Sequence, residues 1–385
     1  MERTIYLDNA ATTFPKPAEV IADMTSVMRY SCGNPGRSSH KIAMRAAEKV
    51  YECREKLADC FGSSPEHVVF TSSATHSLNL AIKTTLRRGD HVLISDIEHN
   101  SVIRPIVTLA EKGLISYDIY VAHSDPEKQI AELNSRIRPC TAMICACHHS
   151  NICNLVLPIR EMGAFCKRHG VIFLVDASQS AGILPINLEK DGIDLLCAPG
   201  HKGLYGPPGC GFAVFGQRFD NPAELPDTFT EGGNGIRSKE PLMPDFLPER
   251  LEAGTLAVPL LAGLSKGIDF VRGFPKGMLY KNEARLCSFM RKELSRISGI
   301  RIYGEHDGSI LLFSADGISA EGFAEALDTY GICVRSGFHC APTAHEKLGT
   351  PDDGAVRVSF GAFNTEKDVS RFCTCAESIV RRLRK

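Results

Sequence analysis

Apolar residues recur at helical spacing between about residues 40 and 62. The apolar positions of "HKIAMRAAEKVYECREKLADCFG" are Ile42, Ala46, Val50, Cys53, Leu57 and Phe61. Intervals of three and four residues place them on one face of a helix, and a glycine after the last of them is a common helix end. The pattern predicts an amphipathic helix that ends at Gly62.

Short continuous apolar runs then alternate with helical patterns as far as residue 215. The runs are "HVVF", "HVLIS", "TAMICAC", "VIFLVD" and "IDLLCA". Strands that are apolar at every position are buried on both faces, and helices between them supply the crossovers that parallel strands need. We therefore predict an α/β fold with a mostly parallel sheet that helices cover on both faces.

The character of the chain changes after residue 216. Residues 217–259 are rich in Pro and Gly and predict irregular structure around a site or a subunit contact. Apolar helices, strand-like "SILLFS", "ICVR" and "AVRVSF", and a final helix from about residue 365 follow. We expect a large domain of residues 15–259 and a small α+β domain of residues 1–14 and 260–385.

Polar segments follow all five apolar runs: "FTSSATHS", "SDIEHNS", "HHSN", "DASQS" and "PGHKG". In open α/β sheets, ligands bind beyond the carboxyl ends of the strands. These five segments are therefore the predicted lining of a binding site.

Composition limits the classes of partner. The chain has 44 Lys and Arg against 45 Asp and Glu, so no basic excess points to nucleic acid or an anionic membrane. "MERTIYLDNAATTFPKP" lacks the apolar core of a signal peptide, and no run approaches the roughly 18 apolar residues of a membrane span. We expect a cytoplasmic protein whose partners are small molecules or proteins. Its fifteen cysteines are scattered through apolar segments, which favours buried thiols over a disulfide framework.

Two charged residues suggest a cofactor. Asp176 ends "VIFLVD", where a buried carboxylate needs a cationic partner, and Lys202 lies in the glycine-rich "APGHKGLYGPPGCG". Pyridoxal phosphate requires a lysine for its covalent attachment and an acid opposite its ring nitrogen. The start of "SSATHSLNLAIK" offers hydroxyls and free backbone N–H groups for a phosphate, although Ser73 to Thr75 can also simply cap a helix.

An ordered set of motifs extends through the chain: "YLDNAATT", "EHNSVI", "HHSN", "DASQSAG", "GHKGLYGPPG", "EAGT", "RSGFHCAP" and "VRVSF". In these motifs the chain resembles the class V aminotransferase family of fold-type I pyridoxal-phosphate enzymes, within it the cysteine desulfurase and selenocysteine lyase branch. The resemblance covers nearly the whole length. It implies a seven-stranded sheet in the large domain, a small domain that carries a catalytic cysteine loop, and a homodimer.

The resemblance also implies roles for single residues. Lys202 would hold the cofactor covalently, Asp176 would pair with its ring nitrogen, Gln179 would bind its ring hydroxyl and His99 would stack on the ring. The phosphate would be bound by Ala74, Thr75 and His201, with Thr255 reaching it from a second subunit. The substrate would be held by Asn151, Arg335 and Arg357, near an entrance formed by Asn9 and Ala10.

Cys340 would be the nucleophile of the implied reaction. A thiolate is required, and the neighbouring Arg335 or His339 would favour it. The implied activity converts L-cysteine to L-alanine, with the sulfur taken up on Cys340 as a persulfide and passed to an acceptor protein or a small thiol. Three alternatives stay open. The first is a selenocysteine lyase that acts on L-selenocysteine, the second is an aminotransferase or other lyase of the same fold, in which Cys340 is dispensable, and the third is a non-catalytic sulfur-transfer scaffold.

Two positions depart from the family pattern, and one cluster invites another interpretation. Pro199 stands where the family often has a phosphate-binding serine, and His76 where many desulfurases have Glu. "CACHHSNIC" contains residues that can bind zinc or iron: Cys145, Cys147, His148, His149 and Cys153. Alternation along a strand sends Cys145 and Cys147 to one face, so we predict packing in the core and no metal site.

Overall fold

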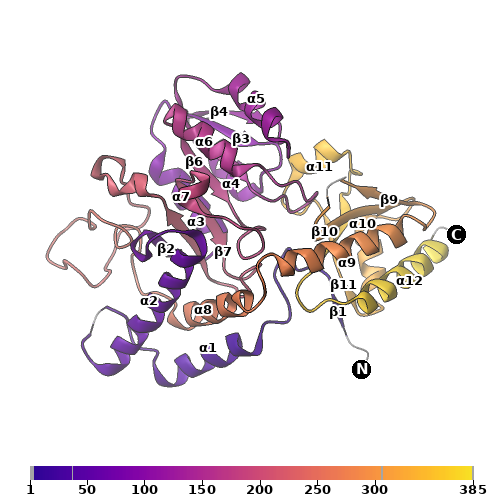
Figure 1. The fold of residues 1–385 in the computed structure, drawn as a ribbon, viewed down its shortest axis with the longest axis horizontal. Coiled ribbons are helices and arrows are strands. Elements are labelled where there is room, and N and C mark those ends of the chain that lie inside the picture. Colours follow the sequence, from indigo (N-terminus) through magenta and orange to yellow (C-terminus); the bar gives the residue numbers. More distant parts are fainter. Residues whose placement is uncertain (1–3, 37, 305–306, 384–385) are drawn as a thin grey trace.

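The computed structural model describes residues 4–36, 38–304 and 307–383. A seven-stranded sheet forms the centre of its larger part, with the strand order β2-β8-β7-β6-β5-β3-β4 (Figure 1). The strands are β2 (Val68–Thr71), β3 (His91–Ser95), β4 (Ser116–Tyr120), β5 (Thr141–Cys147), β6 (Ile172–Asp176), β7 (Leu195–Pro199) and β8 (Gly211–Phe215). Only β8 is antiparallel to its neighbours in this sheet. The predicted seven-stranded, mostly parallel sheet is confirmed.

Helices cover both faces of this sheet. One face packs on α3 (Ala74–Thr85) and α4 (Asn100–Glu111). The opposite face packs on α2 (Lys41–Phe61), α5 (Pro126–Arg136), α6 (Ile159–His169), α7 (Leu188–Asp191) and α8 (Val258–Arg272). Helix α1 (Ala18–Tyr30) lies against α8. Each face therefore has its own hydrophobic core.

The predicted helix before Gly62 is α2. His40 caps its first turn by accepting a hydrogen bond from the Ala43 N–H, and Gly62 ends it with φ of 65°, a left-handed conformation that glycine adopts without strain. Five of the six apolar positions on the predicted helix face are buried, whereas Ile42 in the first turn is 49% exposed. Periodicity alone does not show that the first turn of a long helix extends beyond the sheet that it covers.

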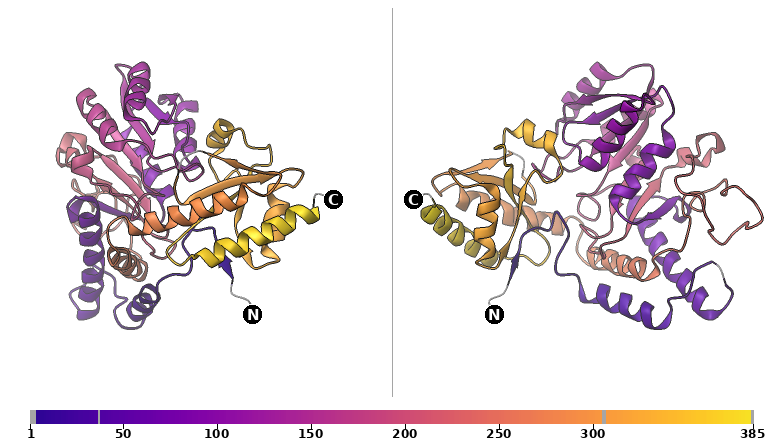
Figure 2. Two further views of the ribbon diagram at one scale, coloured as in Figure 1. Left: turned by 45° about the vertical axis from the view of Figure 1, so that its right-hand side comes forward. Right: turned by 180° about the vertical axis from the view of Figure 1, so that it is seen from behind.

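A smaller unit contains both the N-terminal strand and the last helix (Figures 1 and 2). Its four-stranded antiparallel sheet has the order β12-β13-β10-β9, and β1 pairs with β11 beside it. The strands are β1 (Ile5–Tyr6), β9 (Ile300–Tyr303), β10 (Ile310–Ala315), β11 (Ile332–Cys333), β12 (Arg335–Gly337) and β13 (Ala355–Ser359). The helices are α9 (Met278–Leu294), α10 (Ala320–Asp328), α11 (Pro342–Leu348) and α12 (Glu366–Leu383).

The segment that joins the two sheets is mostly irregular, as predicted. It contains two short 3-10 helices, η2 (Gln217–Asp220) and η3 (Pro222–Glu224), before α8 begins; a third, η1 (Pro65–His67), precedes β2. The predicted domain division at residue 260 stays a prediction; α8, which spans it, packs on the larger core. Within the described ranges, no helix is long and apolar enough to cross a membrane.

Glu283 on α9 provides a test of the buried interior by pH. The side chain is 3% exposed, and burial raises its pKa from 4.5 to about 8. Between these pH values the unfolded chain loses the proton that the folded chain keeps, so the free energy of unfolding falls as pH rises. The side chain of the Glu283→Gln variant is neutral at every pH. We expect the free energy of unfolding of this variant, measured in urea at pH 8, to be higher than that of the wild type by about 2 kcal/mol. The advantage should shrink toward pH 5, and an advantage that is the same at both pH values would contradict the assignment.

Candidate active site

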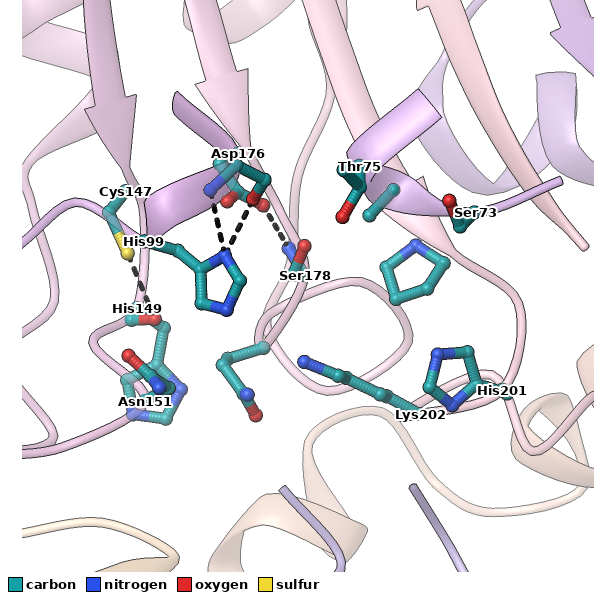
Figure 3. Close-up of a pocket in the computed structure, with 14 residues that line it drawn as sticks. Ser73, Thr75, His99, Cys147, His149, Asn151, Asp176, Ser178, His201 and Lys202 are labelled. Carbon is teal, nitrogen blue, oxygen red and sulfur yellow. Dashed lines mark hydrogen bonds between the residues drawn. The ribbon is translucent and has the colours of Figure 1, made fainter. Parts of the chain in front are cut away.

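The carboxyl ends of five strands converge on one cavity of about 110 Å³ (Figure 3). All five polar segments that follow the predicted strands contribute to its lining, as predicted. The contributing residues are Ser73, Ala74 and Thr75 after β2, His99 and Ser101 after β3, Cys147, His149 and Asn151 around the end of β5, Asp176, Ser178 and Gln179 at the end of β6, and Pro199, His201 and Lys202 at the end of β7.

Asp176 and Lys202 bring opposite charges into this cavity. Asp176 is the last residue of β6, is 3% exposed, and accepts a hydrogen bond of 2.9 Å from the Ser178 N–H. The Lys202 side chain extends into the cavity (Figure 3). Burial lowers the pKa of Lys202 to about 8, because it outweighs the attraction of Asp176, and Arg357 and Arg335 lower it further. A pKa of about 8 leaves a sizeable minority of the amine neutral and nucleophilic at physiological pH.

His99 caps the first turn of α4 and presents its ring to the cavity. Its Nδ1 accepts a hydrogen bond of 3.1 Å from the Ser101 N–H. Burial lowers the pKa of His99, although Asp176 opposes this shift. A neutral ring with an accepting Nδ1 carries its proton on Nε2. His99 therefore offers the cavity a flat, uncharged ring with a fixed tautomer.

The N-terminus of α3 and His201 form a polar group at the cavity wall. Ser73 caps α3 by accepting a hydrogen bond from the His76 N–H, whereas Ala74 and Thr75 at the first turn have no acceptor within the helix. The Nδ1 of His201 is buried and has no hydrogen-bond partner among the described residues. Gly211 lets β8 approach, since a Cβ there would lie 2.5 Å from the Ser73 carbonyl carbon. Helix N-termini with free donors are suited to anions.

Arg357 and Arg335 lie opposite each other on β13 and β12. Arg357 is 1% exposed, pairs with Asp8 at 2.8 Å, and donates to the Asn151 carbonyl at 3.3 Å. Its Nε is buried without a partner in the described part of the chain. Burial lowers the pKa of Arg357, Asp8 opposes this shift, and Arg335 adds to it. The two guanidinium groups carry two positive charges, and the Asp8 carboxylate that pairs with Arg357 balances one of them. The remaining positive charge would attract an added anion.

Cys340 lies on a strained turn between β12 and α11. His339 and Cys340 both have positive φ, 52° and 58°, which costs about 1–3 kcal/mol for each non-glycine residue. The Asn151 side chain donates to the His339 carbonyl at 3.0 Å, and the Asn100 N–H donates to the Cys340 carbonyl at 2.9 Å. The turn is thereby bound to Asn151 of the cavity lining and to Asn100, which lies between the lining residues His99 and Ser101. The thiol is half-buried, 3.6 Å from a guanidinium nitrogen of Arg335.

Four other predicted residues lie at or beyond the edge of this arrangement. The Gln179 amide lines the cavity but also donates to the Ala10 carbonyl at 2.9 Å. Asn9 and Ala10 line a smaller neighbouring cavity with Gln179 and Lys202. Thr255 is exposed and accepts a hydrogen bond from Asn34, away from the cavity lining. The predicted contact of Thr255 with the phosphate concerns a second subunit and stays a prediction.

The two departures from the family pattern differ in position. Pro199 lines the cavity and offers no hydroxyl there. His76 lies outside the lining, where its Nδ1 is 3.2 Å from the Ser72 hydroxyl and its ring contacts Phe229.

Cys147, His149 and Ser178 line the cavity, although none of them was assigned an individual role in the site from the sequence. The signal was present, because each lies at a strand end. The prediction that Cys145 and Cys147 share one face is wrong. Cys145 belongs to the core under α3 and α4, whereas Cys147 belongs to the core on the opposite face and also lines the cavity. No group of three or more metal-ligating side chains was found within residues 4–36, 38–304 and 307–383.

Buried Glu98 was also missed. One of its oxygens accepts hydrogen bonds from the Ser95 hydroxyl and the Cys147 N–H, both at 2.7 Å. Burial raises its pKa to about 8. The carboxyl thus ties the ends of β3 and β5 together immediately before His99, a role that depends on the neighbouring strand and cannot be read from the sequence.

Known proteins share this fold and much of the sequence. The family described as Aminotransferase class-V matches residues 5–372. A probable cysteine desulfurase from Methanothermobacter thermautotrophicus is 32% identical over 97% of this chain and 94% of its own. A solved apo structure of a cysteine desulfurase from Thermococcus onnurineus superposes with a TM-score of 0.89 at 29% identity, covering 99% of this chain and 95% of the other. A solved structure of a cysteine desulfurase from Escherichia coli superposes with a TM-score of 0.87 at 25% identity, covering 99% of this chain and 95% of the other. The chain belongs to the class-V aminotransferase family.

Proposed function

We propose that this protein is a pyridoxal-phosphate-dependent cysteine desulfurase that converts L-cysteine to L-alanine and takes up the sulfur on Cys340. The observation that supports this most is the binding of the Cys340 turn, through Asn151 and Asn100, to the cavity that contains Lys202 and Asp176. A simple lyase or aminotransferase needs no thiol beside such a cavity.

The donor set fits the cofactor. Lys202 supplies an amine of lowered pKa for covalent attachment, Asp176 a buried carboxylate for a ring nitrogen, and His99 a neutral ring to stack on. The free N–H groups at the start of α3 and the unpaired Nδ1 of His201 suit a phosphate. When bound, pyridoxal phosphate withdraws electrons from the substrate carbon. The neutral Lys202 amine can then accept the proton from that carbon.

Arg357 and Arg335 are proposed to bind the carboxylate of the amino acid. Guanidinium groups bind carboxylates through paired hydrogen bonds, and the Nε of Arg357 has no protein partner among the described residues. Asn151, whose side-chain oxygen is buried without a partner within the same ranges, can accept from the substrate. The substrate would then lie between Lys202 and the Cys340 turn.

Cys340 is proposed to take up the sulfur. Its thiolate attacks the substrate sulfur, an S–S bond forms, and the C–S bond breaks. The electron pair of the broken bond stays with the substrate carbon, which is protonated to give alanine. A guanidinium nitrogen of Arg335 lies 3.6 Å from the Cys340 sulfur and can donate a hydrogen bond to it.

The direct test is an assay for alanine and, with a reducing thiol present, sulfide from L-cysteine, with L-selenocysteine in parallel. We expect equal amounts of alanine and sulfide from L-cysteine. Bound cofactor without alanine from either substrate would favour the non-catalytic scaffold, and alanine from L-selenocysteine alone would favour the lyase.

Asp176→Asn tests the proposed partner of the ring nitrogen. The amide has nearly the same shape, so the fold should survive, but it cannot hold a proton on a pyridine nitrogen as a carboxylate does. We expect kcat for alanine formation to fall by about a hundredfold or more, with cofactor still bound. Activity near that of the wild type, with cofactor bound, would give Asp176 another role.

We also propose a homodimer that contacts through α1 and α2. The two helices are linked by an ion pair between Asp23 and Lys49. They carry six exposed large apolar side chains: Ile21, Met28, Tyr30, Ile42, Met44 and Tyr51. Such a surface is typical of an interface between subunits.

Charge at the centre of this surface should separate the subunits. We expect Met28→Glu combined with Ile42→Glu to give a monomer in light scattering, because two buried carboxylates without partners are costly. The matched control is Ile119→Glu on β4, an exposed apolar residue elsewhere, which should leave the dimer intact. A dimer that persists in the double variant would place the interface elsewhere.

A further inference from the structure

The side chain next to the Cys340 thiol belongs to a chain of hydrogen bonds. The His339 Nε2 lies 3.3 Å from the Arg335 carbonyl, and its Nδ1 lies 3.1 Å from the His345 Nε2. The His345 Nδ1 lies 2.9 Å from the Thr350 hydroxyl. Both imidazole rings are buried, with exposures of 3% and 1%. Every ring nitrogen of the pair therefore has one partner.

The chemistry of the partners fixes the direction of this chain. A backbone carbonyl only accepts, so the His339 Nε2 carries the proton that is donated to Arg335. In a neutral ring the His339 Nδ1 then accepts, and the His345 Nε2 must donate to it. The His345 Nδ1 in turn accepts from the Thr350 hydroxyl. Each ring is held in a single tautomer by its neighbour.

Both rings are neutral at physiological pH. Burial, with a smaller contribution from the nearby Arg357 cation, lowers the pKa of His339 to about 2 and that of His345 to about 4. At physiological pH each nitrogen therefore keeps one role as donor or acceptor.

This chain of hydrogen bonds holds the strained turn through residues outside the cavity lining. Asn151 and Asn100 bind the backbone carbonyls of His339 and Cys340, but the positive φ of both residues persists only where side chains also hold the turn. His339 connects the turn to α11 on one side and to the Arg335 carbonyl on the other. Arg335 is also the residue whose guanidinium lies 3.6 Å from the thiol.

We propose that His345 and Thr350 are positioning residues that act through His339 to hold the Cys340 thiol beside Arg335. The proposal deepens the proposed function, since it rests on Cys340 as the sulfur acceptor. Neither residue touches the cavity, so their effect should appear in the reactivity of the thiol and not in cofactor binding.

The test compares two substitutions of equal length. His345→Gln keeps an N–H donor for His339, whereas His345→Met keeps none. Alkylation of Cys340 by iodoacetamide is followed by mass spectrometry in the cofactor-loaded protein, with the exposed Cys32 and Cys140 as internal references. We expect Cys340 in the methionine variant to be alkylated roughly fivefold more slowly than in the wild type, which is the effect of losing one partly exposed charge contact. In the glutamine variant the alkylation rate should stay within about twofold of the wild-type rate. Thr350→Val should give an intermediate rate.

His91→Met is the matched control, because His91 is also buried and its Nδ1 lies 2.8 Å from the Thr141 hydroxyl, in the other unit. It should lower thermal stability without slowing Cys340. The proposal is overturned if the two His345 variants react alike, if the methionine variant is as fast as or faster than the wild type, or if His91→Met slows Cys340 equally. Failure of the wild type to form alanine would refute the proposed function separately, because alkylation needs no turnover.

Discussion

Lys202→Ala should abolish covalent cofactor attachment and turnover together. Lys202 supplies an amine of lowered pKa within the cavity. The methyl group of alanine can neither form the covalent bond to the cofactor nor accept the substrate proton. We expect alanine formation to fall by about a thousandfold or more. Borohydride reduction of the wild type, followed by digestion, should fix the cofactor on the peptide that contains "GHKGLYG", and the variant should yield no such peptide.

A second lysine provides a demanding control. Burial also lowers the pKa of Lys16 to about 8, but its amine donates to the His201 carbonyl at 2.7 Å and to the Thr13 hydroxyl at 2.8 Å. Lys16→Ala should therefore keep the label on Lys202. A label on Lys16 would show that low pKa and not position selects the attachment site, and would remove Lys202 from its proposed role.

Cys340→Ser should bind cofactor and L-cysteine yet stop sulfur uptake. Lys202, Asp176 and Arg357 are unchanged, but a serine hydroxyl is almost wholly protonated at neutral pH and cannot hold sulfur as a persulfide. We expect alanine formation from L-cysteine to fall by about a thousandfold. In the wild type, L-cysteine followed by an alkylating trap should add one sulfur atom to the peptide that contains Cys340.

Two comparisons sharpen this experiment. Cys333 is a half-buried thiol on strand β11, which precedes β12 in the chain. Cys333→Ser should form alanine from L-cysteine at the wild-type rate. Turnover of L-selenocysteine should survive Cys340→Ser better than that of L-cysteine, because selenium is the better leaving group. If the serine variant forms alanine from L-cysteine at the wild-type rate, Cys340 is not the nucleophile and a simple lyase or aminotransferase is the better assignment.

Much of the fold and of the cavity could be predicted because the underlying signals are local. Continuous apolar runs define the buried strands, and the polar residues after them meet because parallel strands end at one edge of the sheet. The direction of β8 could not be predicted in this way, since an apolar run such as "GFAVF" reads the same whether the strand is parallel or antiparallel.

The parts that escaped prediction depend on register or on distant partners. The opposition of Arg335 and Arg357 follows from the pairing of β12 with β13. The bond from Glu98 to the Cys147 N–H requires knowledge of which strands are neighbours. The His339–His345 contact depends on a turn in which His339 and Cys340 have positive φ, and this could not be predicted because few residues other than glycine adopt that conformation.

The ion pair between Asp8 and Arg357 joins positions that are 349 residues apart. At roughly 5–20 residues per second, a ribosome makes them about 20–70 seconds apart. Strand β1 must therefore wait, unpaired, until β11 and β13 have emerged. A nascent chain released just before residue 357 would keep the lysine cavity but lack Arg357 and its ion pair with Asp8. Synthesis of the small unit, and not folding of the large sheet, is thus the event that brings Arg357 to the proposed substrate site.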